Sequence, residues 1–206
     1  MIGIIDYGMG NLHSVQKAFE RIDAQAQIIT EPSQITTADK IVLPGVGAFC
    51  DAIDTLRDKN LVEPITEAVQ SGKWFLGICL GLQLLFDVSY EDGEHQGLGL
   101  VSGQVKRFDF QGRTDEADLK IPHMGWNALN IRRQAPLYSG IENGSFVYFV
   151  HSFYVAPDNQ DVIATTTEHG IDFVSSIWRD NIMATQFHPE KSQRVGLQML
   201  KNFANL

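Results

Sequence analysis

Apolar residues in the first half of the chain occur in two alternating patterns. Short, almost continuous apolar runs, each the length of a buried strand, appear as MIGIID, AQIIT, KIVLPG and KWFLGI. Between them, residues 12–22 and 49–71 carry apolar side chains at helical spacing, and the second stretch is broken near Asn60 and closed by Gly72. Strands that alternate with helices predict an α/β fold built on a mainly parallel sheet.

The pattern changes after about residue 97, where strand-like segments follow one another with few helical stretches between them. They are QVKRF, MGWNALNI, SFVYFVHSFYV, VIATTT, FVSSIW and IMATQF. Such segments predict antiparallel or mixed strands that either extend the sheet or form a small second one. Residues 193–206 return to helical spacing. We therefore predict one domain over residues 1–206, with a flavodoxin-like, doubly wound, mainly parallel sheet, helices on both faces, and antiparallel or mixed strands in the C-terminal half.

Composition and charge argue against nucleic acid and membranes as partners. The formal net charge is −9, which argues against a protein that binds the nucleic-acid backbone. The N-terminal MIGIIDYG lacks a basic segment followed by a long apolar run, and no apolar run approaches the ~20 residues that span a membrane. Two cysteines, Cys50 and Cys79, cannot form a disulfide framework. We therefore expect a cytoplasmic protein that binds neither nucleic acid nor membrane.

Cys79 lies where the run KWFLGI meets the apolar, helix-like segment CLGLQLLF. The segment 77–81, Gly-Ile-Cys-Leu-Gly, has the form of a sharp strand-to-helix turn that presents a nucleophile, in which the flanking glycines must be small. A helix N-terminus favours the thiolate over the thiol, and the amide of Leu80 can face an oxyanion. The alternative is a buried core cysteine; Cys50 we interpret as a helix residue that only packs.

A cysteine nucleophile requires a base, usually histidine, and a group that orients it. Of the six histidines, His188 stands in ATQFHPEKS, two residues before Glu190. In an extended segment residues i and i+2 point to the same side, and Pro189 favours an extended His188. A carboxylate beside the imidazole holds one tautomer and stabilises the imidazolium. A polar turn is the alternative, so a triad of Cys79, His188 and Glu190 depends on both motifs together.

A glycine-rich turn, VLPGVGAF, ends the third apolar run. Strand ends converge at one edge of a parallel sheet, so the backbone amides of Gly45, Val46 and Gly47 can approach Cys79 and supply a second oxyanion donor. The alternative is a plain strand-to-helix connection. The turn YGMGN is too incomplete to predict dinucleotide binding, and no residue cluster has metal-ligand spacing, so we expect neither a cofactor nor a metal.

Three motifs, PGVGAF, GICLG and FHPE, occur in the order and at the spacing of class I (triad-type) glutamine amidotransferases, which the chain resembles over its whole length. DYGMGNLHSV, PGVGAF, IPHMGWN and YFVHSFY together resemble the branch of glutaminase subunits of imidazole glycerol phosphate synthases. The resemblance implies that Cys79 attacks the carboxamide of L-glutamine and forms a glutamyl thioester. Leu80 and the turn at residues 45–47 would stabilise the oxyanion, while His188, oriented by Glu190, would protonate the departing ammonia.

The resemblance also implies the residues that bind substrate and partner. The substrate-binding set is Gly45, Gly47, Gln83, Glu91, Ser152 and Phe153. His151 neighbours this set and is not expected to be catalytic. Ammonia would pass through an internal channel to a (β/α)8-barrel cyclase subunit that forms imidazole glycerol phosphate in histidine biosynthesis. The contact face would be Asn11, Trp126, Tyr148 and Lys191, although Trp126 could instead be core and Lys191 a solvated charge.

Val46 departs from many members of that family, which have glycine at this position. A β-branched residue resists a positive φ, so the amide that should face the oxyanion would point away until a partner binds. We therefore expect low glutaminase activity for the chain alone and higher activity in the liganded complex.

Three other functions remain open from the sequence. The same triad could deliver ammonia to another acceptor, as in anthranilate or guanine nucleotide synthesis, although IPHMGWN and Val46 favour the first interpretation. The triad could also serve a thiol peptidase or esterase, or the chain could be a catalytically silent binding subunit. Labelling by a glutamine-analogue electrophile separates these functions.

Overall fold

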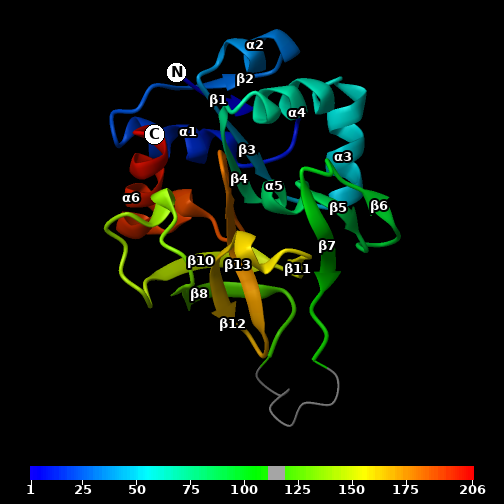
Figure 1. The fold of residues 1–206 in the computed structure, drawn as a ribbon, viewed down its shortest axis with the longest axis vertical. Helices are drawn as coiled ribbons and strands as arrows, with labels where there is room; N and C mark the ends of the chain where they lie inside the picture. The colour runs from blue at the N-terminus through cyan, green and yellow to red at the C-terminus, as the bar shows by residue number, and fades with distance from the viewer. Residues whose placement is uncertain (111–118) are drawn as a thin grey trace.

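The computed structural model describes residues 1–110 and 119–206, whose arrangement is shown in Figure 1. The helices are α1 (Leu12–Glu20), α2 (Pro32–Thr37), α3 (Phe49–Asp58), α4 (Val62–Gln70), α5 (Leu80–Gln83) and α6 (Gln193–Ala204). The strands of the large sheet are β1 (Ile2–Ile5), β2 (Ala26–Ile29), β3 (Lys40–Gly45), β4 (Trp74–Cys79), β5 (Phe86–Ser89), β6 (His95–Gln96), β7 (Val101–Arg107), β9 (Asn130–Ile131), β11 (Phe153–Pro157), β12 (Ile163–Glu168), β13 (Asp172–Arg179) and β14 (Ile182–Thr185). β8 (His123–Ala128) and β10 (Phe146–His151) form a separate two-stranded sheet.

The parallel part of the large sheet has the strand order β2-β1-β3-β4-β14. The four apolar runs of the first half of the sequence are β1 to β4. β1, β3 and β4 are almost entirely buried and apolar because helices cover both of their faces, whereas β2, at the edge of the sheet, is partly exposed. This order is the flavodoxin-like, doubly wound one, and the predicted fold class is confirmed.

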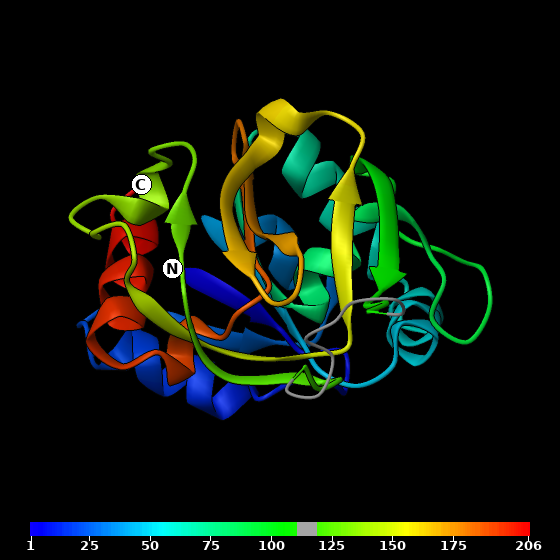
Figure 2. The same ribbon diagram turned by 90° about the horizontal axis from the view of Figure 1, so that it is seen from below.

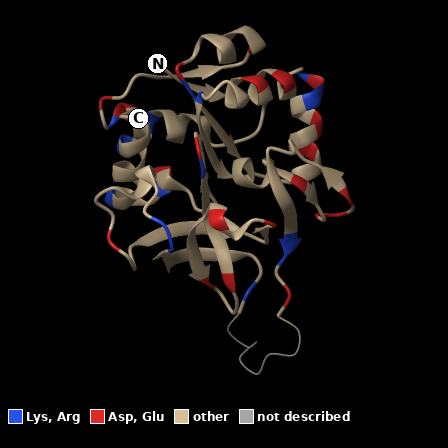
Figure 3. Ribbon diagram, in the orientation of Figure 1, with Lys and Arg blue, Asp and Glu red and all other residues tan. Residues whose placement is uncertain are grey.

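Two hydrophobic clusters occupy the two faces of this sheet, because successive strand residues point to opposite sides. Ile5 and Leu43 belong to the cluster that includes α2, α3 and α4. Ile4 and Val42 belong to the cluster that includes α1 and α6. Figure 2 shows α6 and α1 on one side of the molecule and α3 on the other. The solvent sides of α3 and α4 carry most of their acidic residues, as Figure 3 shows.

The C-terminal half contains both arrangements that the sequence left open: some strands extend the large sheet, and others form a small second sheet. β13, β11 and β7 extend the sheet beyond β14, and each of them pairs antiparallel with the strand before it in this order. β8 and β10 instead form the small second sheet, an antiparallel ribbon that crosses below the parallel strands in Figure 1.

One expected element is shorter in the structure than in the prediction. The apolar segment after Cys79 is helical only over α5, and from Phe86 it continues as β5, which pairs with β7 and β6. Periodicity cannot distinguish a buried helix from a buried strand in a run such as LLF. Hydrogen bonding to the neighbouring strands therefore determines that this segment is a strand. None of the described helices is both long and apolar enough to cross a lipid bilayer.

Candidate active site

Cys79 ends β4 with a φ of +56°, a backbone conformation that is rare for a residue with a side chain. The flanking glycines make this turn possible. A Cβ at Gly77 would lie 2.7 Å from the carbonyl oxygen of Gly81, and a Cβ at Gly81 would overlap the carbonyl oxygen of Leu43 on β3. A strained residue that tight packing holds in place is typical of functional sites. Residues 77–81 therefore form the sharp strand-to-helix turn that the sequence predicts.

Cys79 lines a cavity of about 310 Å³, although only 6% of the residue is exposed. Its Sγ accepts a hydrogen bond from the side-chain amide of Gln186 at 3.7 Å. Leu80 also lines the cavity, and as the first residue of α5 it has an N–H without a partner in the helix. Because α5 has only four residues, its N-terminal field is weaker than the longer helix predicted from sequence would supply.

β14 lies parallel to β4 and leads the chain to His188, which lines the same cavity. The Nδ1–H of His188 donates to Oε1 of Glu190 at 2.8 Å, and both side chains are almost fully buried. Glu190 lies in a 3₁₀ turn, Pro189–Lys191, that follows the extended His188. The two side chains therefore meet because the backbone turns. The expectation that both occupy one extended segment is wrong.

The surroundings of His188 favour its charged form. Burial lowers the pKa of His188, but its contacts with Cys79 and Glu190 outweigh burial and raise this pKa to about 10. Its other ring nitrogen, Nε2, is buried and has no well-aligned hydrogen-bond partner among the described residues. The site therefore suits an imidazolium at His188, with Nε2 left for proton transfer at the cavity.

The backbone of His188 is tied to β10. Its N–H donates to the carbonyl oxygen of Tyr148 at 3.0 Å. The hydroxyl of Ser192 donates to the carbonyl oxygen of His188 at 2.7 Å and accepts from the N–H of Tyr148 at 3.0 Å. The ribbon of β8 and β10 therefore helps to position the histidine.

The structure brings most of the expected substrate and oxyanion residues to this cavity. Besides Cys79, Leu80 and His188, the lining includes Val46, Gly47, Gln83, Glu91, Ser152 and Phe153. Gly45 lies behind the lining, opposite Cys79 in the register of β3 and β4, where a Cβ would collide with the Tyr7 hydroxyl. The site therefore combines the ends of β3, β4, β10 and β14 with the segment that follows β5.

Two polar side chains of the lining have fixed partners. Gln83 donates from Nε2 to the carbonyl oxygen of Phe153 at 3.2 Å and to Oε1 of Gln186 at 3.1 Å. Oε2 of Glu91 accepts from the backbone N–H of Phe49 at 2.8 Å, and burial raises the pKa of this carboxyl. A carboxylate and a side-chain amide that line the same cavity can bind the polar ends of a small amino acid.

The four expected partner contacts lie outside the cavity lining. Trp126 and Tyr148 are cross-strand neighbours on β8 and β10, with their rings T-shaped at 6.1 Å. The Nζ of Lys191 lies over the Tyr148 ring at 5.8 Å. Asn11 precedes α1 and is exposed. The structure therefore groups three of the four side chains on one surface.

Comparison with known proteins identifies the family. The family model "Glutamine amidotransferase class-I" matches residues 3–206. The chain belongs to the class I glutamine amidotransferases. This enzyme family accounts for a cysteine on a sharp turn beside a histidine and a carboxylate, and it confirms the resemblance inferred from the motifs.

This amidotransferase is similar to two proteins named imidazole glycerol phosphate synthase subunit HisH. It is 55% identical to that of Syntrophotalea carbinolica over 206 residues, which is 100% of both chains. It is 55% identical to that of Geobacter metallireducens over 203 residues, which is 98% of this chain and 97% of the relative.

Two solved structures show the same fold at low sequence identity. PurLQS from Thermotoga maritima matches with a TM-score of 0.76 and 17% identity, over 99% of this chain and 97% of that one. The glutaminase domain of Trypanosoma brucei CTPS with bound acivicin matches with a TM-score of 0.68 and 16% identity, over 99% and 93%.

Several residues of this amidotransferase site were missed by sequence reasoning. Pro122 and Val150 line the cavity beside His151, which the sequence had placed next to the substrate set, and Gln186 reaches the sulfur. Tyr7 is fully buried, and burial followed by the charge of Cys79 raises its pKa. Pro122, Val150, Gln186 and Tyr7 all lie inside quoted segments (IPHMGWN, YFVHSFY, ATQFHPEKS and YGMGN), but no local signal assigned them a role.

Cys50 is a residue of helix α3, as the sequence predicts, and it is half-buried there. Its Sγ lies 3.5 Å from Oδ2 of Asp54. It is not part of the cavity lining. Within residues 1–110 and 119–206, no three His, Cys, Asp or Glu side chains are grouped as a metal site.

Proposed function

We propose that this amidotransferase is the glutaminase subunit of an imidazole glycerol phosphate synthase and acts in histidine biosynthesis. The observation that carries the proposal is a single cavity lined by Cys79 and His188, with Glu190 bonded to the histidine. Relatives that are 50–55% identical over nearly the whole chain are named as this subunit. The proposed substrate is L-glutamine, and the products are glutamate and ammonia.

In the proposed reaction, the Cys79 thiolate attacks the side-chain carboxamide carbon of glutamine. The carbonyl oxygen becomes an oxyanion, which the N–H of Leu80 and an amide of the turn at residues 45–47 stabilise. The His188 imidazolium protonates the leaving nitrogen, so ammonia departs and a glutamyl thioester remains. Neutral His188 then accepts a proton from water as that water attacks the thioester. Glutamate leaves and the thiolate–imidazolium pair is restored.

The oxyanion turn supports the expectation that activity depends on a partner. Gly47 has a φ of +95°, whereas Val46 does not share this positive φ. A β-branched residue resists rotation into that region, so the Val46–Gly47 peptide keeps one orientation until another contact changes it. We infer that glutaminase activity is low in the isolated chain and rises in the complex.

The proposed partner is a (β/α)8-barrel cyclase subunit that receives ammonia through an internal channel. Exposed Trp126 and half-buried Tyr148 and Lys191 supply an aromatic and cationic surface on and beside the ribbon, and Asn11 would extend this contact. Aromatic side chains are enriched at such interfaces. Released ammonia would be protonated in water, so a docked acceptor is chemically useful.

Labelling by acivicin, an electrophilic glutamine analogue, tests the chemistry. We expect one covalent adduct, which glutamine suppresses and which Cys79→Ser abolishes. Cys50→Ser is the matched control and should label like the wild type. An adduct that persists in Cys79→Ser contradicts the assignment of the nucleophile.

Co-purification of untagged partners, followed by a glutamine-to-glutamate assay with each nucleotide ligand, tests the assignment to this synthase. We expect a barrel-type cyclase to co-purify and its ligand to raise glutaminase turnover. Equal turnover for the isolated chain and the liganded complex would count against the role of Val46. Capture of a different synthase would instead favour another ammonia acceptor.

A further inference from the structure

Two buried histidines link the β8–β10 ribbon to the cavity. His123 and His151 are directly opposite each other in the antiparallel register. Nδ1 of His123 lies 2.9 Å from Nε2 of His151, and Nδ1 of His151 lies 2.8 Å from the carbonyl oxygen of Phe153. Because Phe153 lines the cavity, this pair connects the ribbon to a backbone group of the candidate substrate site.

The direction of each hydrogen bond follows from its partners. The Phe153 carbonyl can only accept, so Nδ1 of His151 carries the proton. Nε2 of a neutral His151 is then an acceptor, so Nδ1–H of His123 donates to it. Nε2 of His123 is left as an acceptor for the Asn127 amide at 3.2 Å. The chain is complete only when both rings are neutral.

The surroundings keep both rings neutral. Burial lowers the pKa of His151 to about 3, and burial together with the neighbouring His169 lowers the pKa of His123 to about 4. The rings pack against Phe149 and Phe173. Among the described residues no carboxylate is paired with either ring, so an imidazolium in this apolar cluster would lose solvation without a compensating charge there.

The hydrogen bonds continue from Phe153 to the sulfur. The same carbonyl oxygen accepts from Nε2 of Gln83, which also donates to Oε1 of Gln186. The amide of Gln186 in turn donates to Sγ of Cys79. A fixed Phe153 carbonyl therefore orients two side-chain amides beside the nucleophile.

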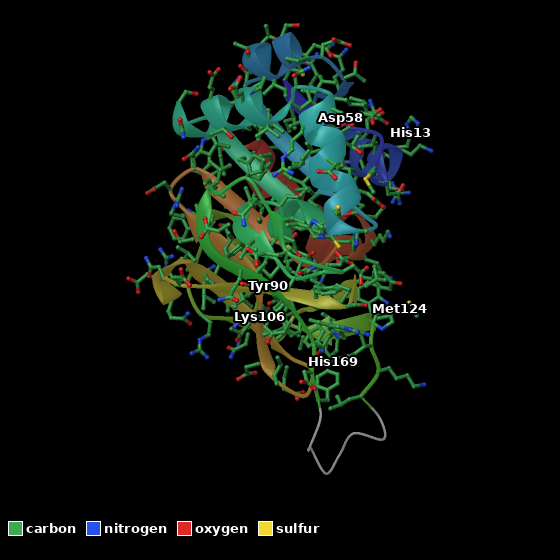
Figure 4. The ribbon with its side chains drawn as sticks, turned by 90° about the vertical axis from the view of Figure 1, so that its right-hand side faces the viewer. His13, Asp58, Tyr90, Lys106, Met124 and His169 are labelled. Carbon is green, nitrogen blue, oxygen red and sulfur yellow. The ribbon has the colours of Figure 1, made fainter. Side chains whose placement is uncertain are left out.

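The opposite face of the ribbon is exposed. Side chains alternate along β8, so His123 points inward while Met124 and Trp126 lie 66% and 46% exposed. Figure 4 shows Met124 pointing away from the molecule. A contact on this outer face therefore bears on the same strand that holds His123 against His151.

We propose that His123 and His151 are positioning residues that form a neutral hydrogen-bonded relay from the β8–β10 ribbon to Phe153, and that this relay sets the affinity of the cavity for glutamine. The inference rests on the proposed function, because it assigns a role within the same substrate site. Neither ring acts on the reacting atoms. The relay controls how glutamine is held, whereas the reactivity of the thiol comes from His188 and Glu190.

The test compares two alkylating agents on the full-length chain. Saturation kinetics with acivicin give an apparent dissociation constant and a limiting rate, whereas iodoacetamide reports thiol reactivity without recognition of glutamine. Loss of one hydrogen bond in a polar site corresponds to about a tenfold change. In His123→Leu we therefore expect a roughly tenfold larger acivicin dissociation constant, with the iodoacetamide rate within about twofold of wild type.

Two further variants separate a relay from simple packing. His123→Asn retains an amide donor near the position of Nδ1 and should restore most of the acivicin affinity. His169→Leu removes a ring stacked on His123 at 4.1 Å that makes no hydrogen bond in the relay, so it should bind acivicin like the wild type. An unchanged constant in His123→Leu, or an equal rise in His169→Leu, overturns the proposal.

Nitrogen-15 NMR of the wild-type imidazoles provides a readout that needs no variant. We expect His123 and His151 to be neutral with the proton on Nδ1 at pH 6. A proton on Nε2 of His151, or a charged ring at that pH, overturns the relay even if the variants fail to fold. If wild-type Cys79 reacts with iodoacetamide but never saturably with acivicin, the proposed function fails, and the NMR result still decides whether the relay exists.

Discussion

At the scale of single residues, Glu190 accepts the Nδ1–H of His188. Its side chain is 1% exposed, and its second oxygen, Oε2, is buried without a hydrogen-bond partner among the described residues. A buried carboxylate is stable only when a nearby positive charge compensates it. The carboxylate therefore stabilises the charged form of the histidine.

Glu190→Gln tests this dependence. The amide keeps the shape but removes the negative charge that helps to raise the pKa of His188, so this pKa should fall below its present value of about 10. We expect kcat for glutamine hydrolysis to drop about 100-fold, because less imidazolium is available to protonate ammonia. The limb of the pH–rate profile that belongs to His188 should move to lower pH.

The matched control is Glu67→Gln on the exposed side of α4. It removes the same charge far from His188 and should leave kcat and the pH profile unchanged. A Glu190→Gln enzyme with a wild-type pH profile would show that the carboxylate does not tune the histidine.

At the scale of elements, the sharp turn between β4 and α5 depends on close packing against β3. Gly81→Ala would place a methyl group onto the carbonyl oxygen of Leu43. We expect a loss of about 3 kcal/mol or more in the free energy of unfolding, because backbone must move to relieve the overlap. Urea unfolding monitored by circular dichroism measures this loss.

Gly140→Ala separates steric overlap from backbone strain. Gly140 has a φ of +72°, but a Cβ there would meet no atom within 4 Å. We expect a loss of only about 1 kcal/mol, from the positive φ alone. Equal losses in the two variants would mean that the Gly81 overlap is relieved without cost.

The ribbon is the second element with a specific expectation. Trp126→Ala should weaken binding of the proposed cyclase partner about 30-fold or more, because central aromatic contacts dominate interfaces. Isothermal titration calorimetry with the purified partner measures the change. Tyr90→Ala is the control: Tyr90 is 49% exposed and follows β5, away from the ribbon, as Figure 4 shows. Similar losses in both variants would place the interface elsewhere.

The whole molecule should lose stability in mild acid because it buries neutral histidines. His123 and His151 have folded pKa values of about 4 and about 3, below the unfolded value near 6.5. The unfolded chain therefore binds more protons as the pH falls below 6.5, and each histidine lowers the free energy of unfolding by about 1.4 kcal/mol per pH unit. His188 has the opposite sign: its raised pKa contributes stability below pH 6.5, which is lost as pH rises towards about 10.

Urea unfolding between pH 7 and pH 5 tests the acid limb. The slope of the free energy of unfolding against pH should become shallower in His123→Phe, whatever the stability of that variant at pH 7. A wild-type free energy of unfolding that stays constant between pH 6.5 and pH 5 would contradict the assignment of two buried neutral rings.

Local patterns were enough to predict the parallel half of the fold. β1 to β4 are short, almost continuous apolar runs, and α1 and α3 show clear helical spacing. The prediction of a helix after Cys79 was wrong beyond Gln83, because a run of apolar residues shows no periodicity that would distinguish a helix from a strand. α2 was not predicted, since its start signal, Glu31 with Gln34, is a short capping box and not an apolar pattern.

The sequence by itself determined the parallel α/β architecture, the tight turn at Cys79 and the pairing of His188 with Glu190, because each depends on residues within a few positions of one another. Only the tertiary structure decided which distant groups complete the site. Gln186, just after β14, donates to the sulfur of Cys79, Tyr7 lies behind Gly45, and the two relay histidines meet across β8 and β10. Their roles arise from strand order and cross-strand register, which join residues that are distant in the sequence and leave no local pattern in the chain.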